Sequence, residues 1–267
     1  MVNLRLKVKT KIPITASCIS PDVFYGKSKK EIKKLEVFYG NKQKSLGELF
    51  EISGEDSDIV MEGDFSRVKQ IGSKMTCGKI LIKGDCGMHL GSYMKGGEIL
   101  VEGNVSDWCG AEMRGGFIRI KGNAGNLLGA AYRGSKWGMN RGTIIVEGNA
   151  LNEVGIWMKR GIIVVLGDVG NFAGAHMKGG TIISYGKIGE RVGAEMNRGT
   201  IIAFKKPELL PTFKYDCTYN PSFLRFFLKE LSEYGIPVKR EHITGLYERY
   251  NGDFTELSKG EVLVFGG

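Results

Sequence analysis

The chain has 267 residues, of which 40 are glycine and 42% are hydrophobic, and its formal net charge is +9. So many glycines exclude a fold of long helices, and the longest apolar run, Ile162 to Leu166, is too short to span a membrane. The positive charge suits nucleic acid, an acidic partner or an acidic ligand, but no nucleic-acid motif with interleaved aromatic residues is present, so we expect no nucleic-acid binding.

Residues 1–58 are not repetitive, and we expect them to form an N-terminal β cap within the same domain as the rest of the chain. Val2 to Val8 alternates apolar and polar residues, which predicts a strand. Leu35 to Phe38 predicts a second strand, and Ser45 to Phe50 predicts a turn or short helix. We interpret the basic run Lys27 to Lys34 as a solvated loop.

Residues 59–205 are organised by a repeat, G-x-x-M-x-x-G-x-I-x-[IV]-x-G, with a period of 19 residues. The stretch Ile59 to Gly63 resembles the end of one unit. The third step between copies is 26 residues, which is one period plus an insertion of seven. A fixed period in this range is typical of repeat architectures. The copies are marked by Met75, Met94, Met113, Met139, Met158, Met177 and Met196.

The positions around each methionine predict the geometry of one repeat. The third position after it is always glycine, which suits a corner with positive φ. The third position before it is glycine except in the fourth copy, where Lys136 stands. The fifth and seventh positions after it are mostly Ile or Val, on one face of a short strand. We therefore predict an all-β fold: a single-stranded, right-handed parallel β-helix of about seven 19-residue coils, capped at both ends.

The insertion lies within Leu128 to Trp137 and is rich in aromatic and basic residues. We interpret it either as a protruding loop that contacts a partner or as a loop folded back on the wall of the repeats. The candidate contact residues are Tyr132, Arg133, Lys136 and Trp137.

The period stops after Pro207, and residues 206–267 are expected to form a C-terminal cap with one helix near residues 221–234. Asn220 and Pro221 fit an N-cap and first helical position, and Gly235 fits the end of the helix. The last three repeats carry apolar residues on their outer face, a surface too large to leave in water. We expect this helix, or a partner protein, to cover it. The face includes Leu166, Tyr185 and Phe204.

The residues that usually carry chemistry are sparse and scattered. The 5 cysteines form no C-x-x-C pair, which favours reduced thiols in a cytoplasmic protein. The 3 histidines show no metal-ligand spacing, and no P-loop, nucleophile elbow or dinucleotide fingerprint is present. A lone base at His176 is far less favoured than a surface histidine. We therefore assign no catalytic, cofactor-binding or metal-binding residue to the chain.

One set of positions stands out by its charge. The first two positions after the methionines are often basic, and stacking would align them as a ridge along one edge. The ridge is interpreted either as a docking surface for an acidic subunit or polyanionic ligand, or as a hydrated corner that prevents association. We call the following residues the basic ridge: Lys95, Arg114, Arg141, Lys159, Arg160, Lys178 and Arg198.

The repeat, with I-G-S-K-M, L-G-S-Y-M-K-G-G-E-I-L-V-E-G-N and L-G-A-A-Y-R-G-S-K-W-G-M-N-R-G-T-I-I-V-E-G-N, closely resembles the C subunit of archaeal formylmethanofuran dehydrogenase. It is also similar to the C-terminal domain of the glutamate synthase large subunit. The length and the two added end segments favour the dehydrogenase family.

This resemblance implies a non-catalytic structural subunit in a cytoplasmic hetero-oligomer. In that family the complex reduces CO2 and condenses it with methanofuran to N-formylmethanofuran, the first step of methanogenesis from CO2, with electrons from reduced ferredoxin. The tungsten- or molybdenum-pterin, the iron–sulfur clusters and the metal-dependent amidohydrolase site lie on other subunits. The resemblance therefore implies no cofactor bound by this chain.

Two alternatives stay open. One is a glutamate synthase-like β-helix domain that acts as a scaffold in an amidotransferase complex. The other is a small-molecule enzyme such as a β-helical acyltransferase, although the Met-and-Gly pattern fits the hexapeptide rhythm of those enzymes poorly.

Overall fold

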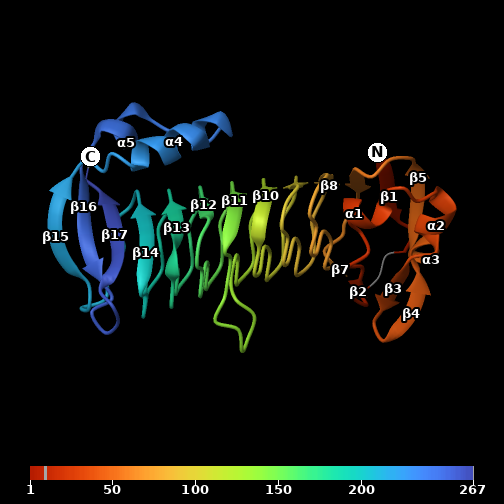
Figure 1. The fold of residues 1–267 in the computed structure, drawn as a ribbon, viewed down its shortest axis with the longest axis horizontal. Helices are drawn as coiled ribbons and strands as arrows, with labels where there is room; N and C mark the ends of the chain where they lie inside the picture. The colour runs from red at the N-terminus through yellow and green to blue at the C-terminus, as the bar shows by residue number, and fades with distance from the viewer. Residues whose placement is uncertain (9–10, 267) are drawn as a thin grey trace.

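The structure is a computed structural model that describes residues 1–8 and 11–266. It is mostly β, as predicted, with two sheets of 13 and 4 strands and a few short helices. The strands of the large sheet stand side by side in a long row, with the two termini at opposite ends (Figure 1). Their order is β15-β16-β17-β14-β13-β12-β11-β10-β9-β8-β6-β1-β5.

The two strands predicted in the N-terminal segment are present, at Val2–Leu6 and Glu36–Tyr39. The prediction of a solvated loop at Lys27 to Lys34 is wrong, because this basic run contains a helix. Ser28 and Glu31 form a capping box at its start, and Ile32 is buried against the core. The elements are β1 (Val2–Leu6), β2 (Ile14–Thr15), α1 (Pro21–Phe24), α2 (Lys29–Lys33), β3 (Glu36–Tyr39), β4 (Lys42–Ser45), α3 (Leu46–Leu49) and β5 (Phe50–Gly54).

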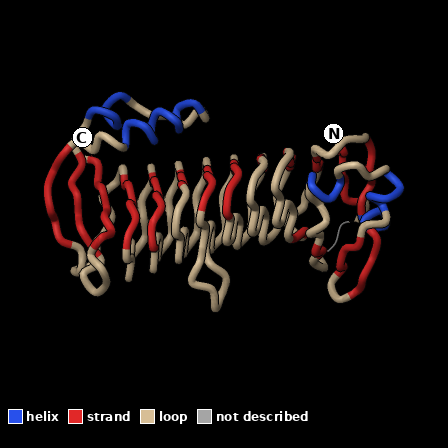
Figure 2. Tube along the Cα trace, in the orientation of Figure 1, coloured by secondary structure: helices blue, strands red, loops and turns tan. Residues whose placement is uncertain are grey.

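Each repeat supplies one short strand to the large sheet, and most of each repeat is loop and turn (Figure 2). Ile59–Glu62 forms the first of these strands, which confirms its likeness to the end of a repeat unit. The strands are β6 (Ile59–Glu62), β7 (Val68–Lys69), β8 (Lys79–Lys83), β9 (Glu98–Val101), β10 (Arg114–Ile120), β11 (Arg141–Val146), β12 (Ile162–Val165), β13 (Lys178–Ser184) and β14 (Arg198–Ala203).

Successive repeats pair in parallel and in register. Ile80 lies opposite Ile99, and Ile99 opposite Ile118. The insertion does not shift this register, because Ile118 lies opposite Ile144. A second column of parallel bridges runs through a different part of each repeat. It joins Phe65, Cys86, Val105, Ala124, Ala150, Val169 and Ile188 in that order.

The seven repeat methionines are all fully buried in one continuous core, as predicted. The first six each reach under the corner glycine of the next repeat, and Met196 lies under Gly260 of the C-terminal segment. A Cβ at Gly97 would lie 2.5 Å from Cε of Met75, and one at Gly199 would lie 2.8 Å from Cε of Met177. The φ of Gly97 is also positive, at 83°. The glycine is therefore required both by its backbone conformation and by the methionine beneath it.

In the fourth repeat, the prediction that Lys136 takes the place of the corner glycine is wrong. In an ordinary repeat the methionine N–H donates to the glycine three residues earlier, as from Met94 to Gly91 at 3.1 Å. The N–H of Met139 instead donates to the carbonyl of Gly129, at 2.9 Å. Gly129, not Lys136, therefore occupies the corner, and the inserted residues lie between Gly129 and Met139.

Asparagine and aspartate side chains join successive repeats. The Oδ1 of Asp85 accepts from the backbone N–H of Asn104 at 2.7 Å, and Oδ1 of Asn104 accepts from Asn123 at 2.9 Å. The same bond continues through Asn149 to Asp168 at 2.7 Å. These side chains satisfy corner amides that the short strands leave unpaired.

The C-terminal segment contains more regular structure than the single predicted helix. That helix is present, but it begins at Leu224 after Phe223, so the predicted cap at Asn220 and Pro221 is wrong. It is joined by a second helix and three strands that were not predicted. The strand β17 pairs in parallel with β14, and β16 and β15 then add antiparallel to the end of the sheet. The elements are β15 (Lys214–Tyr219), α4 (Leu224–Glu233), α5 (Arg240–Thr244), β16 (Tyr247–Gly252) and β17 (Lys259–Phe265).

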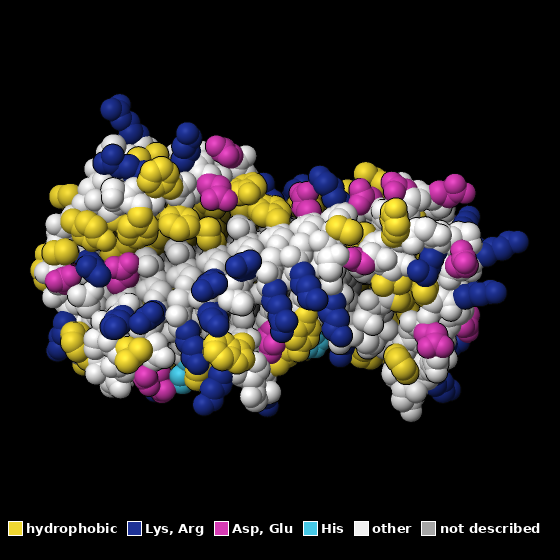
Figure 3. Space-filling view, in the orientation of Figure 1, with side chains coloured by type: hydrophobic (Ala, Val, Ile, Leu, Met, Phe, Trp, Pro, Cys, Tyr) yellow, Lys and Arg dark blue, Asp and Glu magenta, His cyan; other side chains and the backbone are white. Residues whose placement is uncertain are grey.

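The helix α4 covers the apolar outer face of the last repeats, as one of the two alternatives predicted. Leu224, Leu228 and Leu231 form a second buried cluster with strand residues such as Val164 and Ile183. Figure 3 shows this apolar band between the C-terminal helices and the row of strands. The chain therefore buries this surface itself.

Carboxylates close the two ends of the stack. At the N-terminal end, Asp22 accepts from the backbone N–H of Thr76 at 2.9 Å, from the Ser20 hydroxyl at 3.0 Å, and from the Thr76 hydroxyl. At the other end, Asp253 accepts from the N–H of Glu195 at 2.9 Å. Both side chains satisfy amides that have no further repeat to pair with.

We predict that Asp22→Ala lowers the free energy of unfolding by about 1–3 kcal/mol at neutral pH, because it leaves the Thr76 amide without its acceptor. Burial raises the pKa of Asp22, but hydrogen bonds from Thr76 and Ser20 outweigh it, and the net pKa is lowered. The stabilisation is therefore full above the ordinary carboxyl pKa and is lost as pH falls through the lowered one. Chemical denaturation across pH measures it.

The control for that prediction is Glu36→Ala, which removes an exposed carboxylate of β3. Its effect on stability is expected to be within about 0.5 kcal/mol. Equal effects of the two substitutions would contradict the role given to Asp22.

We predict that Leu228→Asp detaches α4, because it places a charge in a fully buried site. The expected loss is about 3–5 kcal/mol, with rapid proteolysis between residues 206 and 246. The matched control is Phe226→Asp on the same helix, where the ring is 78% exposed. If both variants resisted protease like the parent chain, the docking of α4 would be disproved.

Candidate docking surface

The structure places the basic ridge on successive repeats, at the corner where the strands begin. The backbone N–H of Arg114 donates to the carbonyl of Met94, and that of Lys159 donates to the carbonyl of Met139 two repeats further along. Arg114 also lies opposite Arg141, and Lys178 opposite Arg198. Within residues 1–8 and 11–266, none of the seven ridge cations takes part in an ion pair.

Most of the ridge is exposed to solvent. Lys159 and Lys178 are half-buried, and the other five cations are exposed. Figure 3 shows Lys and Arg side chains gathered in a band along the visible face, below the apolar patch. Like charges about 4.8 Å apart along a stack repel one another. An anion that bound here would relieve this repulsion.

The inserted loop both projects and folds back. Figure 1 shows it extending beyond the row of corners near β11. Its first part is anchored, because the Tyr132 ring stacks on Trp108 with centroids 4.8 Å apart and its hydroxyl lies 2.9 Å from Nδ1 of His89. Burial raises the pKa of Tyr132 to about 12 and lowers the pKa of His89. Tyr132 is thus an anchor, whereas Arg133 is exposed.

The second part of the loop carries Trp137, which is 53% exposed. Nζ of Lys159 lies 4.3 Å from the centroid of its ring, and Nζ of Lys178 lies 4.8 Å from it. Two ammonium groups therefore share one indole. Lys136, on the same loop, lies 5.9 Å from the ring centroid of Trp157. The loop thus gathers cations and indole rings on the ridge.

The apolar candidates belong to a different surface. Leu166, Tyr185 and Phe204 pack with α4, α5 and their flanking residues. The ring of Phe204 lies 4.3 Å from that of His242, and burial raises the pKa of Tyr185 to about 12. These three residues are half-buried within the chain, so they are not brought together with the basic ridge.

The three histidines remain apart from one another, and Nδ1 of His176 lies 3.2 Å from Oε2 of Glu195. His89, His176 and His242 lie in three separate aromatic contacts, with Tyr132, Trp157 and Phe204 respectively. Across the described part of the chain, no group of three His, Cys, Asp or Glu side chains could hold a metal ion.

The two fully buried cysteines belong to the core. Cys86 is in the second column of bridges, and Cys109 lies in the same core cluster. Burial raises the pKa of the Cys86 thiol to about 12, and the pKa of Cys109 is raised for the same reason. Both thiols are therefore protonated and unreactive at neutral pH.

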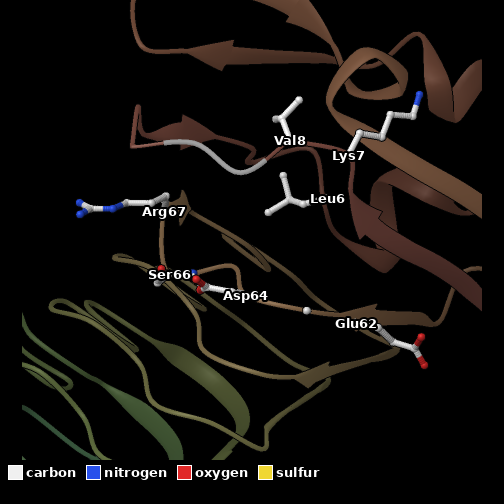
Figure 4. A pocket seen from close by; sticks show the side chains of 8 residues that line it. Leu6, Lys7, Val8, Glu62, Asp64, Ser66 and Arg67 are labelled. Atoms are coloured by element: carbon white, nitrogen blue, oxygen red, sulfur yellow. The ribbon is translucent and has the colours of Figure 1, made fainter.

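A cavity of about 530 Å³ lies between the N-terminal segment and the first repeats. Figure 4 shows Leu6 and Val8 on one side of it and Asp64 and Ser66 on the other. Its carboxylates already have partners: Asp64 accepts from the Ser66 amide at 2.8 Å, and Glu62 pairs with Lys83 at 3.0 Å and with Arg5. No convergent set of reactive groups lines it within the described residues.

A smaller cavity, of about 220 Å³, adjoins the inserted loop and the ridge. Its lining includes Asn140, whose Oδ1 is buried and has no hydrogen-bond partner within the described residues. Such an unsatisfied acceptor costs about 1–3 kcal/mol. Sequence reasoning missed Asn140, because it is uncharged where Arg114 and Lys159 hold the same position in the adjoining repeats. The sequence feature that could have indicated Asn140 is its position directly after the insertion.

No helix among residues 1–8 and 11–266 has the length and apolar character needed to cross a bilayer.

The comparisons with known proteins agree with this architecture. A family model described as "GXGXG motif" matches residues 78–217, which is more than half of the chain. A chain in the crystal structure of the formyltransferase/hydrolase complex (FhcABCD) from Methylorubrum extorquens, in complex with methylofuran, is 33% identical with a TM-score of 0.91, and the match covers 98% of both chains.

Two curated relatives come from Methanothermobacter marburgensis. The C subunit of its tungsten-containing formylmethanofuran dehydrogenase 2 is 47% identical over 95 residues, which are 33% of this chain and 35% of the relative. The C subunit of its molybdenum-containing formylmethanofuran dehydrogenase 1 is 51% identical over 82 residues, which are 30% of this chain and 20% of the relative. The chain thus spans about a third or less of the length of these relatives. By its motif, its repeats and its structure, the chain belongs to the GXGXG-motif family and is similar to the C subunits of the formylmethanofuran dehydrogenases.

Proposed function

We propose that the chain is a non-catalytic structural subunit of a complex of the formylmethanofuran dehydrogenase type. The observation that carries this proposal is the full-length likeness to a chain of the FhcABCD complex. That likeness includes the N-terminal and C-terminal segments, which are the parts that distinguish this chain from a bare repeat. A chain shaped throughout like a member of that complex is expected to serve as one.

The finer description of the fold belongs to the same proposal. A right-handed parallel β-helix of about seven 19-residue coils would give a straight, stiff body. The in-register parallel pairing, the second column of bridges and the buried file of methionines support it. Stiffness follows because every repeat is fixed to both of its neighbours by backbone and side-chain hydrogen bonds.

The proposed role leaves the reactive centres to other subunits. The complex would reduce CO2 and condense it with methanofuran, using reduced ferredoxin, in the cytoplasm. A tungsten- or molybdenum-pterin, iron–sulfur clusters and an amidohydrolase-type metal site would all lie outside this chain. The lack of a metal-ligand group among the described residues supports this division.

A second candidate is favoured by one specific observation. The full-length match is to a formyltransferase/hydrolase complex, whereas the dehydrogenase relatives match over about a third of this chain. The chain could therefore hold together subunits that transfer or hydrolyse a formyl group without redox chemistry. The structural role of this chain is the same in both candidates, and the partner subunits differ. Neither set of relatives favours the glutamate synthase-like alternative.

We predict that an affinity-tagged chain purified from its native cells brings with it subunits with amidohydrolase and formyltransferase sequences. Metal analysis then separates the two candidates, because tungsten or molybdenum with iron in the complex supports the dehydrogenase and their absence supports the hydrolase. The isolated chain is expected to show neither metal nor turnover. Turnover by the chain alone, or recovery of the chain without other subunits, would refute the structural role.

A further inference from the structure

The cavity beside the inserted loop is built from both the loop and the ridge. Trp137 and Gly138 contribute from the loop side, and Arg114, Asn140 and Lys159 contribute from three successive repeats. Its volume of about 220 Å³ is small, and is suited to a single side chain rather than to a folded domain. It opens on the basic ridge, which continues on both sides of it.

The cavity is rich in cations that lack counter-ions. Arg114 is exposed, and Lys159 is held against the ring of Trp137 together with Lys178. Within the described residues, none of these three cations pairs with a carboxylate, although several surface cations elsewhere do, such as Lys79 with Glu98 at 3.0 Å. The site thus has an excess of positive charge beside an aromatic ring.

Asn140 adds an unsatisfied polar group. Asn140 lines the cavity, and its Oδ1 is buried without a partner among the described residues. The NH2 group of the same amide is a hydrogen-bond donor, which suits an anion. The side chain can therefore satisfy itself on a carboxylate oxygen that neighbours Arg114 and Lys159.

Glu112 is the one carboxylate in the described lining, and it is already engaged. Its Oε1 accepts from the backbone N–H of Tyr132 at 3.3 Å, so it faces the anchored part of the loop. This bond ties the loop to the repeat that carries Arg114. Glu112 thus helps to position the loop, while the cations and Asn140 define the part of the cavity available to a ligand.

The ridge continues the same charge along the array. Its cations recur with the spacing of stacked strands, about 4.8 Å, from Lys95 to Arg198. In an extended segment the side chains of one face recur about every 6.6–6.8 Å. Several carboxylates of one segment could therefore reach ridge cations while one of them enters the cavity. A compact anion would use only a small part of this surface.

We infer that the cavity between the loop and the ridge receives a carboxylate side chain from an extended acidic segment of a partner protein in the complex. Arg114 and Lys159 pair with the carboxylate, Asn140 donates to it, and Trp137 packs against its aliphatic part. The neighbouring ridge cations pair with further acidic residues of the same segment. This inference rests on the proposed structural role, because it names the surface through which that role is carried out.

The test uses a fluorescein-labelled peptide of alternating Glu and Ser, titrated with the full chain and followed by fluorescence anisotropy. The parent chain is expected to bind it with an affinity that falls as salt rises, and to bind the Gln-Ser peptide at least about tenfold more weakly. Arg114→Gln/Lys159→Gln and Trp137→Ala are each expected to weaken binding about five- to tenfold. Thermal unfolding verifies that each variant is folded.

The matched control, Lys187→Gln/Lys229→Gln, removes two exposed cations outside the ridge and is expected to change affinity less than about twofold. Equal weakening by the control pair, no binding by the parent chain, or tighter binding of a single-stranded oligonucleotide of equal charge would each overturn the inference.

Tagged variants in native cells separate this inference from the proposed function. If the parent chain recovers its partner subunits and Arg114→Gln/Lys159→Gln recovers them equally well, the inference fails and the structural role stands. If the parent chain recovers none, the structural role itself fails.

Discussion

The fold depends on the fit between each methionine and the corner glycine of the next repeat. A side chain at Gly97 would meet Cε of Met75 at 2.5 Å, so the repeats approach as closely as they do only because the corner residue has no side chain. The contact recurs along the array and fixes the register of the paired strands. One repeat alone cannot bury its methionine, and stability therefore arises only from stacking.

Stacking leaves unpaired backbone amides at both ends of the array and an apolar outer face on its last repeats. The segments outside the repeat pair these amides and cover this face. Asp22 and Asp253 accept from amides that have no further repeat to pair with. The helix α4 buries the outer face over Val164 and Ile183. With these surfaces closed by the chain itself, the basic ridge and the loop that carries Trp137 remain as a charged region without ion pairs among the described residues, which fits docking.

Most of the fold could be predicted from the sequence, because the residues that recur every 19 positions are also the ones that are buried or that form corners. The methionine file, the corner glycines and the covering helix follow from that pattern. The helix at Lys29–Lys33 was missed because its charges concealed the Ser28 and Glu31 cap. The roles of Tyr132 and Asn140 were not predictable, since they depend on where the insertion folds, and its length alone does not determine that path.

The central claim is that this chain serves by its shape and surface charge and holds no reactive centre. Electron cryo-microscopy of the native complex tests it most directly. The account predicts an unbroken array lying between larger subunits, with the ridge buried against an acidic segment and every metal and substrate bound by other chains. A metal or substrate centre ligated by side chains of this chain would contradict it.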